Sequence, residues 1–75
     1  MTEKERRILN RIPKKYRNHI INLVISKSGD CNVQGRELLN YTVTYDNGDE
    51  HVYQNQYYMF WHIREYTNAE GYIEG

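Results

Sequence analysis

Four side chains of this 75-residue chain could bind a metal or act in nucleophilic catalysis: His19, His51, His62 and Cys31. A zinc site usually includes paired ligands a few residues apart, as in Cys-x-x-Cys. None of these four residues lies that close to another. The sequence therefore predicts no metal and no cofactor, and we expect the histidines at ordinary surface or rim positions.

Cys31 and any histidine could in principle form a nucleophile and its base. A lone cysteine among Gly29, Asp30 and Asn32 is more typical of a turn without a catalytic role. The acidic segment 46–50 lacks the length and the terminal glutamate of an EF-hand loop. The chain also has no glycine-rich phosphate loop. We therefore predict that the protein is not an enzyme.

Charge is distributed unevenly along the chain, although the formal net charge is zero. Residues 1–27 carry eight Lys/Arg and two Glu, a net charge of +6, and residues 28–75 carry two Arg and eight acids, a net charge of −6. Such asymmetry indicates a charged partner or head-to-tail contacts between copies, which would make a homo-oligomer. Alternatively, the two halves neutralise each other within one fold.

The basic segment 6–17 is a candidate nucleic-acid-binding arm. A cluster of this size could neutralise several phosphates, and a tyrosine within it could stack on a base. The residues that could contact RNA or DNA are Arg6, Arg7, Arg11, Lys14, Lys15, Tyr16 and Arg17. The other interpretation is a solvated helix face.

The acidic half suggests a different partner, a protein with a basic groove. Acids interleaved with aromatic residues suit an Arg/Lys-lined channel, because tyrosine adds contact area at low entropic cost. The candidate partner-binding residues are Asp46, Asp49, Glu50, Tyr57, Tyr58, Trp61 and Glu65. An ordinary acidic surface is the alternative.

The basic arm is expected to be helical. Thr2 and Glu5 have the spacing of a capping box, which predicts a helix over about 3–11 with Ile8, Leu9 and Ile12 as its apolar edge. Pro13 suits a helix start, so residues 13–19 are expected to form a second short helix.

Residues 20–26 fit both helical and strand spacing. Because the segment is rich in β-branched residues, we favour a strand over about 22–27, with Ile21, Leu23 and Ile25 on one face. Residues 28–32 are then expected to be a loop, extended by Gly35.

A β-hairpin is expected at 39–54, with Leu39, Tyr41, Val43 and Tyr45 on one strand face. Asn47-Gly48 favours a two-residue turn, which would pair Val43 with Val52 and Thr44 with His51. A bulged three-residue loop would shift this register by one.

A helix from Gln56 to Tyr66, capped by Asn55, follows the hairpin. Its core face is expected to carry Met59, Phe60, Ile63 and Tyr66, with Tyr57, Tyr58 and Trp61 on the other side. Residues 72–75 are a tail or an added edge strand.

Together these elements predict one small α+β domain over residues 1–75: short N-terminal helices, a three-stranded antiparallel sheet with a hairpin at 39–54, and a C-terminal helix packed on one face. No apolar run is long enough for a membrane span, and no apolar signal region begins the chain. A single cysteine favours a reducing, cytoplasmic setting.

In size, composition and architecture the chain resembles small accessory proteins of phages and mobile elements, and in particular those of the anti-CRISPR type. The resemblance rests on the acidic, tyrosine-bearing segments Tyr45 to Glu50 and Glu65-Tyr66, not on a motif, and the basic arm departs from it. It implies an inhibitor, acting in the cytoplasm of a bacterial host, that binds a CRISPR effector nuclease and blocks its nucleic-acid-binding groove.

Overall fold

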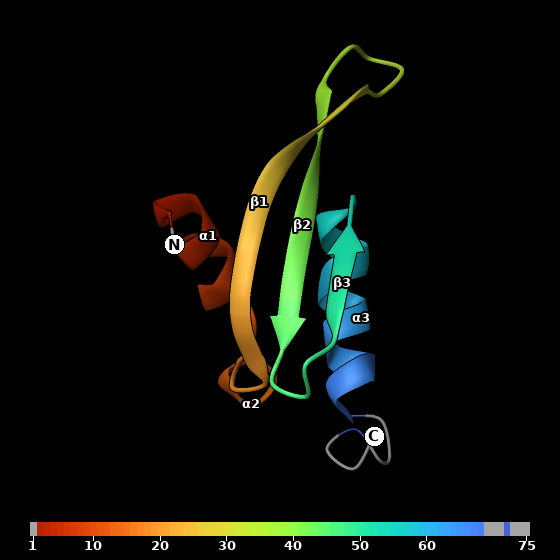
Figure 1. Ribbon diagram of the computed structural model, residues 1–75. Coiled ribbons are helices and arrows are strands. Elements are labelled where there is room, and N and C mark those ends of the chain that lie inside the picture. Colours follow the sequence, from red (N-terminus) through yellow and green to blue (C-terminus); the bar gives the residue numbers. More distant parts are fainter. Residues whose placement is uncertain (1, 69–71, 73–75) are drawn as a thin grey trace.

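The computed structural model describes residues 2–68 and Tyr72 and has the predicted α+β fold. The elements are α1 (Glu3–Asn10), α2 (Lys14–Arg17), β1 (Ile20–Cys31), β2 (Glu37–Tyr45), β3 (Glu50–Tyr53) and α3 (Gln56–Asn68). The strands form one antiparallel sheet in the order β1-β2-β3. Figure 1 shows α1 and α2 on the β1 side of the sheet and α3 on the β3 side.

Both N-terminal helices begin as the sequence predicts. The hydroxyl of Thr2 accepts a hydrogen bond from the Glu5 N–H at 3.2 Å, and the Glu5 carboxylate accepts one from the Thr2 N–H at 2.6 Å, which completes the capping box. Helix α1 ends at Asn10, and Pro13 stands at the N-cap of α2. The apolar edge of α1 is confirmed, since Ile8 and Ile12 are buried.

Strand β1 is confirmed over helix for residues 20–26, but it is longer than predicted. The expected loop at 28–32 is wrong, because the strand continues to Cys31 through an irregular register in which Gly29 has a φ of +85°. Glycine adopts this conformation without steric cost. The reversal lies instead at residues 32–36, which we name the distal turn.

The predicted inward position of Ile21 is also wrong. A register shift between Ile20 and Asn22 inserts one residue into β1, as in a β-bulge. Ile20 consequently packs against the core, and Ile21 is 64% exposed.

The predicted register of the second hairpin is wrong by one residue. Val43 pairs with His51 and Thr44 with Glu50, so the loop has the three-residue form. A two-residue type I′ turn needs two residues with positive φ, whereas only Gly48, at +92°, has it here. We name residues 45–49 the proximal turn.

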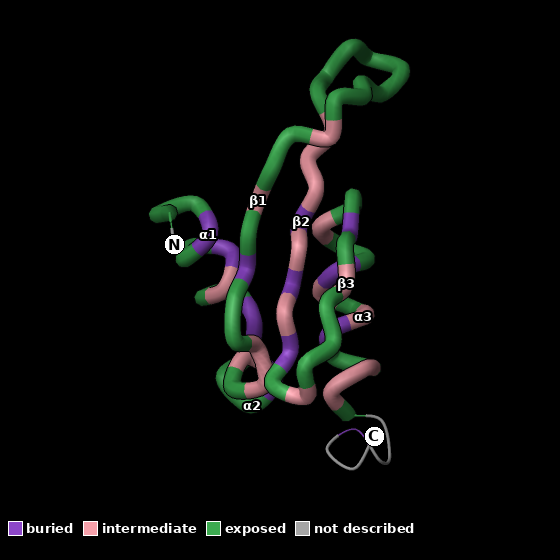
Figure 2. Tube along the Cα trace, viewed as in Figure 1, coloured by how far each residue is buried: buried purple, intermediate pink, exposed green. Residues whose placement is uncertain are grey.

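The core lies on the face of the sheet that the helices cover. Over residues 41–45 of β2, buried and half-buried residues alternate, whereas the distal turn is exposed throughout (Figure 2). The buried hydrophobic residues are Ile8, Ile12, Tyr16, Leu23, Tyr41, Val43, Tyr45, Tyr53, Met59, Ile63 and Tyr72. Residues 41, 43 and 45 therefore share the inner face, as predicted.

Helix α3 has the expected cap and core face. The side chain of Asn55 accepts a hydrogen bond from the Tyr58 N–H at 3.0 Å. Met59 and Ile63 are fully buried, and Phe60 and Tyr66 are partly buried against the same core. No helix in the described residues is long and apolar enough to cross a membrane. Of the tail or edge strand predicted at 72–75, only Tyr72 lies within the described residues.

Glu5 connects α1 to the free edge of β1 through a hydrogen bond that no local sequence pattern predicts. Its carboxylate accepts a second hydrogen bond, from the Ile25 N–H at 2.8 Å, and the side chain is buried. The N–H groups of Thr2 and Ile25 lower the pKa of the Glu5 carboxyl. Glu5 thus caps a helix and satisfies an edge-strand amide at once, which fixes α1 beside the sheet.

Candidate functional site

The acids of the proximal turn are hydrogen-bonded within the fold. Asp46 Oδ2 lies 3.0 Å from His19 Nδ1, and Asp46 Oδ1 accepts a hydrogen bond from the Tyr72 hydroxyl at 2.8 Å. The Tyr72 and His19 contacts lower the pKa of the Asp46 carboxyl. This predicted partner-binding residue therefore has a structural role in the folded chain.

Asp49 has a similar position at the other end of the turn. It accepts a hydrogen bond from the Tyr66 hydroxyl, which in turn accepts one from the Asn47 side-chain amide at 2.9 Å. The bond to Asp49 raises the pKa of Tyr66. Glu50, the third predicted acid of this region, is exposed at the start of β3.

The aromatic residues predicted for the outer side of α3 are exposed there. The exposed fractions are 86% for Tyr57, 53% for Tyr58 and 57% for Trp61. The rings of Tyr58 and Trp61 lie 5.9 Å apart, and Glu65 is exposed one turn beyond Trp61. We name Tyr57, Tyr58 and Trp61 the aromatic crest. More than half of the surface of each of these residues is exposed, which leaves apolar area available to a partner.

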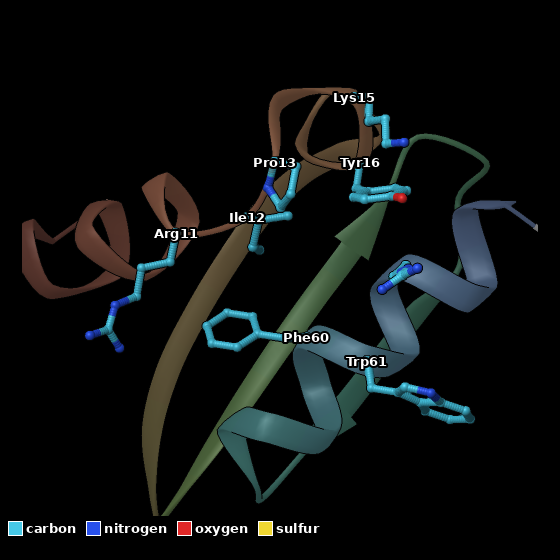
Figure 3. A pocket seen from close by; sticks show the side chains of 8 residues that line it. Arg11, Ile12, Pro13, Lys15, Tyr16, Phe60 and Trp61 are labelled. Atoms are coloured by element: carbon cyan, nitrogen blue, oxygen red, sulfur yellow. The ribbon is translucent and has the colours of Figure 1, made fainter.

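A groove of about 490 Å³ lies between the α1–α2 segment and α3, next to Trp61. Its lining residues are Arg11, Ile12, Pro13, Lys15, Tyr16, Phe60, Trp61 and Arg64. In Figure 3 the ring of Phe60 points into the space between the two sides, whereas the ring of Trp61, which lines the rim, points away from the α1–α2 segment. Three of the eight lining residues are cations and none is an acid.

The structure divides the predicted basic arm. Arg11, Lys15 and Tyr16 line the groove, where the Lys15 ammonium lies 4.8 Å from the centre of the Tyr16 ring. The four remaining cations are outside it: Arg6, Arg7, Lys14 and Arg17. Tyr16 is only 8% exposed, so its ring belongs to the core and offers little surface for stacking.

Sequence reasoning missed the contribution of α3 to this basic surface. Arg64 and Phe60 line the groove, and the Arg11 guanidinium donates to the Gln56 side chain at 3.4 Å across 45 positions of sequence. A local signal for part of it exists, because Tyr57, Trp61 and Arg64 have the i, i+4, i+7 spacing of one helix stripe.

A hydrogen-bonded chain of aromatic residues lies under the opposite side of α3. The hydroxyls of Tyr45 and Tyr53 are 2.8 Å apart, and Tyr53 Oη lies 2.6 Å from His62 Nδ1. Burial and the neighbouring His51 ring lower the pKa of His62. In the described residues, no three His, Cys, Asp or Glu side chains gather as metal ligands would.

Searches against protein-family models, curated proteins and solved structures find no match to this chain. The aromatic crest and the basic groove beside it are the two surfaces of the described residues that could bind a partner.

Proposed function

We propose that the protein is a non-catalytic inhibitor that binds a nucleic-acid-handling effector, of the CRISPR-nuclease kind, through the aromatic crest of α3. The observation that carries this proposal is the exposure of three neighbouring aromatic residues on a helix whose opposite side carries the fully buried Met59 and Ile63. Binding energy at protein interfaces concentrates in Trp, Tyr and Arg, and the aromatic crest supplies Trp and Tyr.

The charged residues around the crest would set the rate and the salt dependence of association more than the affinity. Glu65 and Glu50 are exposed, so both remain free to meet a basic surface of the partner. Asp46 and Asp49 are hydrogen-bonded to tyrosine hydroxyls and would contribute mainly through the long-range field. An effector that binds nucleic acid has a basic groove of the required sign.

The test begins with affinity capture from the bacterial host, using the tagged chain and mass spectrometry. We expect a nuclease that is recovered by the wild type and by Cys31→Ser, whose residue is exposed on β1 at the distal turn. The double variant Tyr57→Ala/Trp61→Ala should lose it. Two truncated interface anchors typically weaken binding by about 100-fold or more.

The captured nuclease is then assayed for cleavage with and without the protein. Inhibition by the wild type that disappears in the crest variant would support the proposal. Recovery of the nuclease by the crest variant at wild-type level, or capture that leaves cleavage unchanged, would contradict it.

A further inference from the structure

The groove between α1–α2 and α3 has the charge of an anion-binding site. Arg11 and Lys15 approach from the N-terminal side and Arg64 from α3, and all three side chains belong to exposed residues. None of the three forms an ion pair with an acid in the described residues. Such a cluster attracts an anion, and its desolvation cost is small because the groove is open to solvent.

The floor of the same groove is apolar, which a site for a simple anion does not require. Ile12 is buried there, Pro13 and Phe60 add further apolar surface, and Trp61 stands at the rim. A ligand that fits both features has regularly spaced negative charges and a flat apolar group. Nucleotides combine these in one unit, and positively charged grooves with exposed aromatic rings are typical of single-strand binding.

We infer that this groove binds single-stranded nucleic acid, with phosphates on Arg11, Lys15 and Arg64 and a base stacked on Trp61. In a duplex the bases stack on each other and present phosphate alone, so a duplex would use the cations without the ring. An acidic peptide would satisfy the cations but brings no obligatory planar group. The inference goes beyond the proposed function and does not depend on it, because Arg11 and Lys15 lie outside the aromatic crest.

Trp61 is the only tryptophan of the chain, so its fluorescence reports on this rim alone. Titration with oligo(dT) of about 15 nucleotides, which covers a typical single-strand site, should quench it. If three phosphates are bound, the log–log dependence of affinity on salt should have a slope of about −2, since each phosphate contributes about 0.7 for single strands.

Charge variants locate the site. Arg64→Ala and Lys15→Ala should each weaken binding and make the salt slope shallower by about 0.7. Arg36→Ala is the matched control, because it removes one exposed positive charge in the distal turn and should change neither quantity. Trp61→Ala, followed by anisotropy of a labelled oligonucleotide, should weaken binding by about tenfold, the scale of one stacked base.

Several outcomes would overturn the inference. Absence of quenching at low salt would do so, and so would an equal loss of affinity in Arg36→Ala and Arg64→Ala. Tighter binding of a duplex of the same length would exclude the stacked base. Poly-glutamate that quenches Trp61 more strongly than oligo(dT) would assign the groove to an acidic protein segment instead.

The groove and the aromatic crest share Trp61, so variants of residues that belong to one surface alone are needed to separate the two activities. Tyr57→Ala should keep the oligonucleotide affinity and weaken capture of the effector, whereas Lys15→Ala/Arg64→Ala should lose the oligonucleotide and keep the effector. Loss of both ligands in both variants would contradict the assignment of two surfaces.

Discussion

The distal and proximal turns have the same backbone geometry and different surroundings. In each, the first residue donates its N–H to the carbonyl of the fifth, at 2.9 Å for Asn32 and 2.8 Å for Tyr45, and the fourth residue is a glycine with positive φ. The proximal turn is held by tyrosine and histidine side chains from outside the hairpin. All hydrogen bonds recorded for the distal turn stay within its own hairpin.

The two turns show that the backbone conformation of a turn does not determine what its side chains contact. Both turns place a glycine with positive φ in the fourth position and use an asparagine side chain to bind backbone N–H groups. Asp46 and Asp49 of the proximal turn lie at the edge of the core, because each accepts a hydrogen bond from a tyrosine hydroxyl outside the hairpin. Val33 at the distal turn meets nothing and is fully exposed. An acidic turn is therefore weak evidence for a binding surface unless the residues packed against it are known.

The largest effect on stability is expected from a substitution in the core, and a substitution in the distal turn should have a much smaller one. Ile63→Ala removes a fully buried side chain and should lower the free energy of unfolding by about 2–5 kcal/mol, which in a chain this small approaches the whole stability. Val33→Ala at the distal turn should stay within about 0.5 kcal/mol of the wild type. Urea melts of the two variants compare these free energies, and similar losses of stability would show that the distal turn is packed in solution.

Alkaline pH should also act on the proximal region. Burial raises the pKa of Tyr45, Tyr53 and Tyr72, and the bond to Asp49 raises that of Tyr66. A raised pKa in the folded state means that stability is complete below the ordinary value of 10.0 and is lost as pH rises above it.

We therefore expect cooperative unfolding by circular dichroism above about pH 10, together with tyrosinate absorbance. Tyr45→Phe, which cannot ionise at this position, should move the transition to higher pH. Titration of all the tyrosines near pH 10 with no loss of structure would contradict the buried network.

A smaller effect on the free energy of unfolding is expected when one carboxylate of each hairpin is replaced by an amide. Asp46→Asn weakens the bonds to Tyr72 and His19 and should cost about 1 kcal/mol, a value reduced by the partial exposure of the carboxylate. Asp30→Asn, at an exposed position near the end of β1, is the matched control and should leave the free energy of unfolding almost unchanged.

The pH dependence of these two variants sharpens the result. Because the pKa of Asp46 is lowered, its contribution is present above the ordinary value of 3.8 and lost as pH falls below it. Thermal melts near neutral pH and near pH 3 should therefore differ less for Asp46→Asn than for the wild type. An unchanged difference would place the acid sensitivity elsewhere.

Local sequence patterns predicted the elements well. The capping box of Thr2 and Glu5, the alternation along β2 and the helical spacing of Met59 and Ile63 each depend on residues close in sequence. The exposed crest followed from the same helical spacing. These features could be predicted because period and capping chemistry are fixed by backbone geometry.

The errors arose where a choice between similar backbone solutions decides the outcome. Asn47-Gly48 is compatible with two turn lengths, and the longer turn shifts the register of β3 by one residue. Gly29 permits β1 to continue through an irregular register instead of ending. Neither choice is determined by composition.

The groove could not be predicted because its two sides are distant in sequence. Arg11 and Gln56 are 45 positions apart, and the packing of α1 on β1 and of α2 on α3 brings them together. The contact of Glu5 with Ile25, which fixes α1, is likewise non-local. Sequence periodicity predicts which helix carries each cation, but it does not predict which side chains of another helix lie beside that cation.

The central claim, that the aromatic crest and not the exposed distal turn is the partner-binding surface, is tested most directly by the affinity of two variants for the captured effector. Tyr57 and Val33 are the two most exposed large apolar residues in the described part of the chain, so both can be changed with little effect on the fold. Isothermal titration should show Kd raised by about 30-fold for Tyr57→Ala, as for one interface anchor, and essentially unchanged for Val33→Asp. An unchanged Kd for Tyr57→Ala together with a large loss for Val33→Asp would contradict the account.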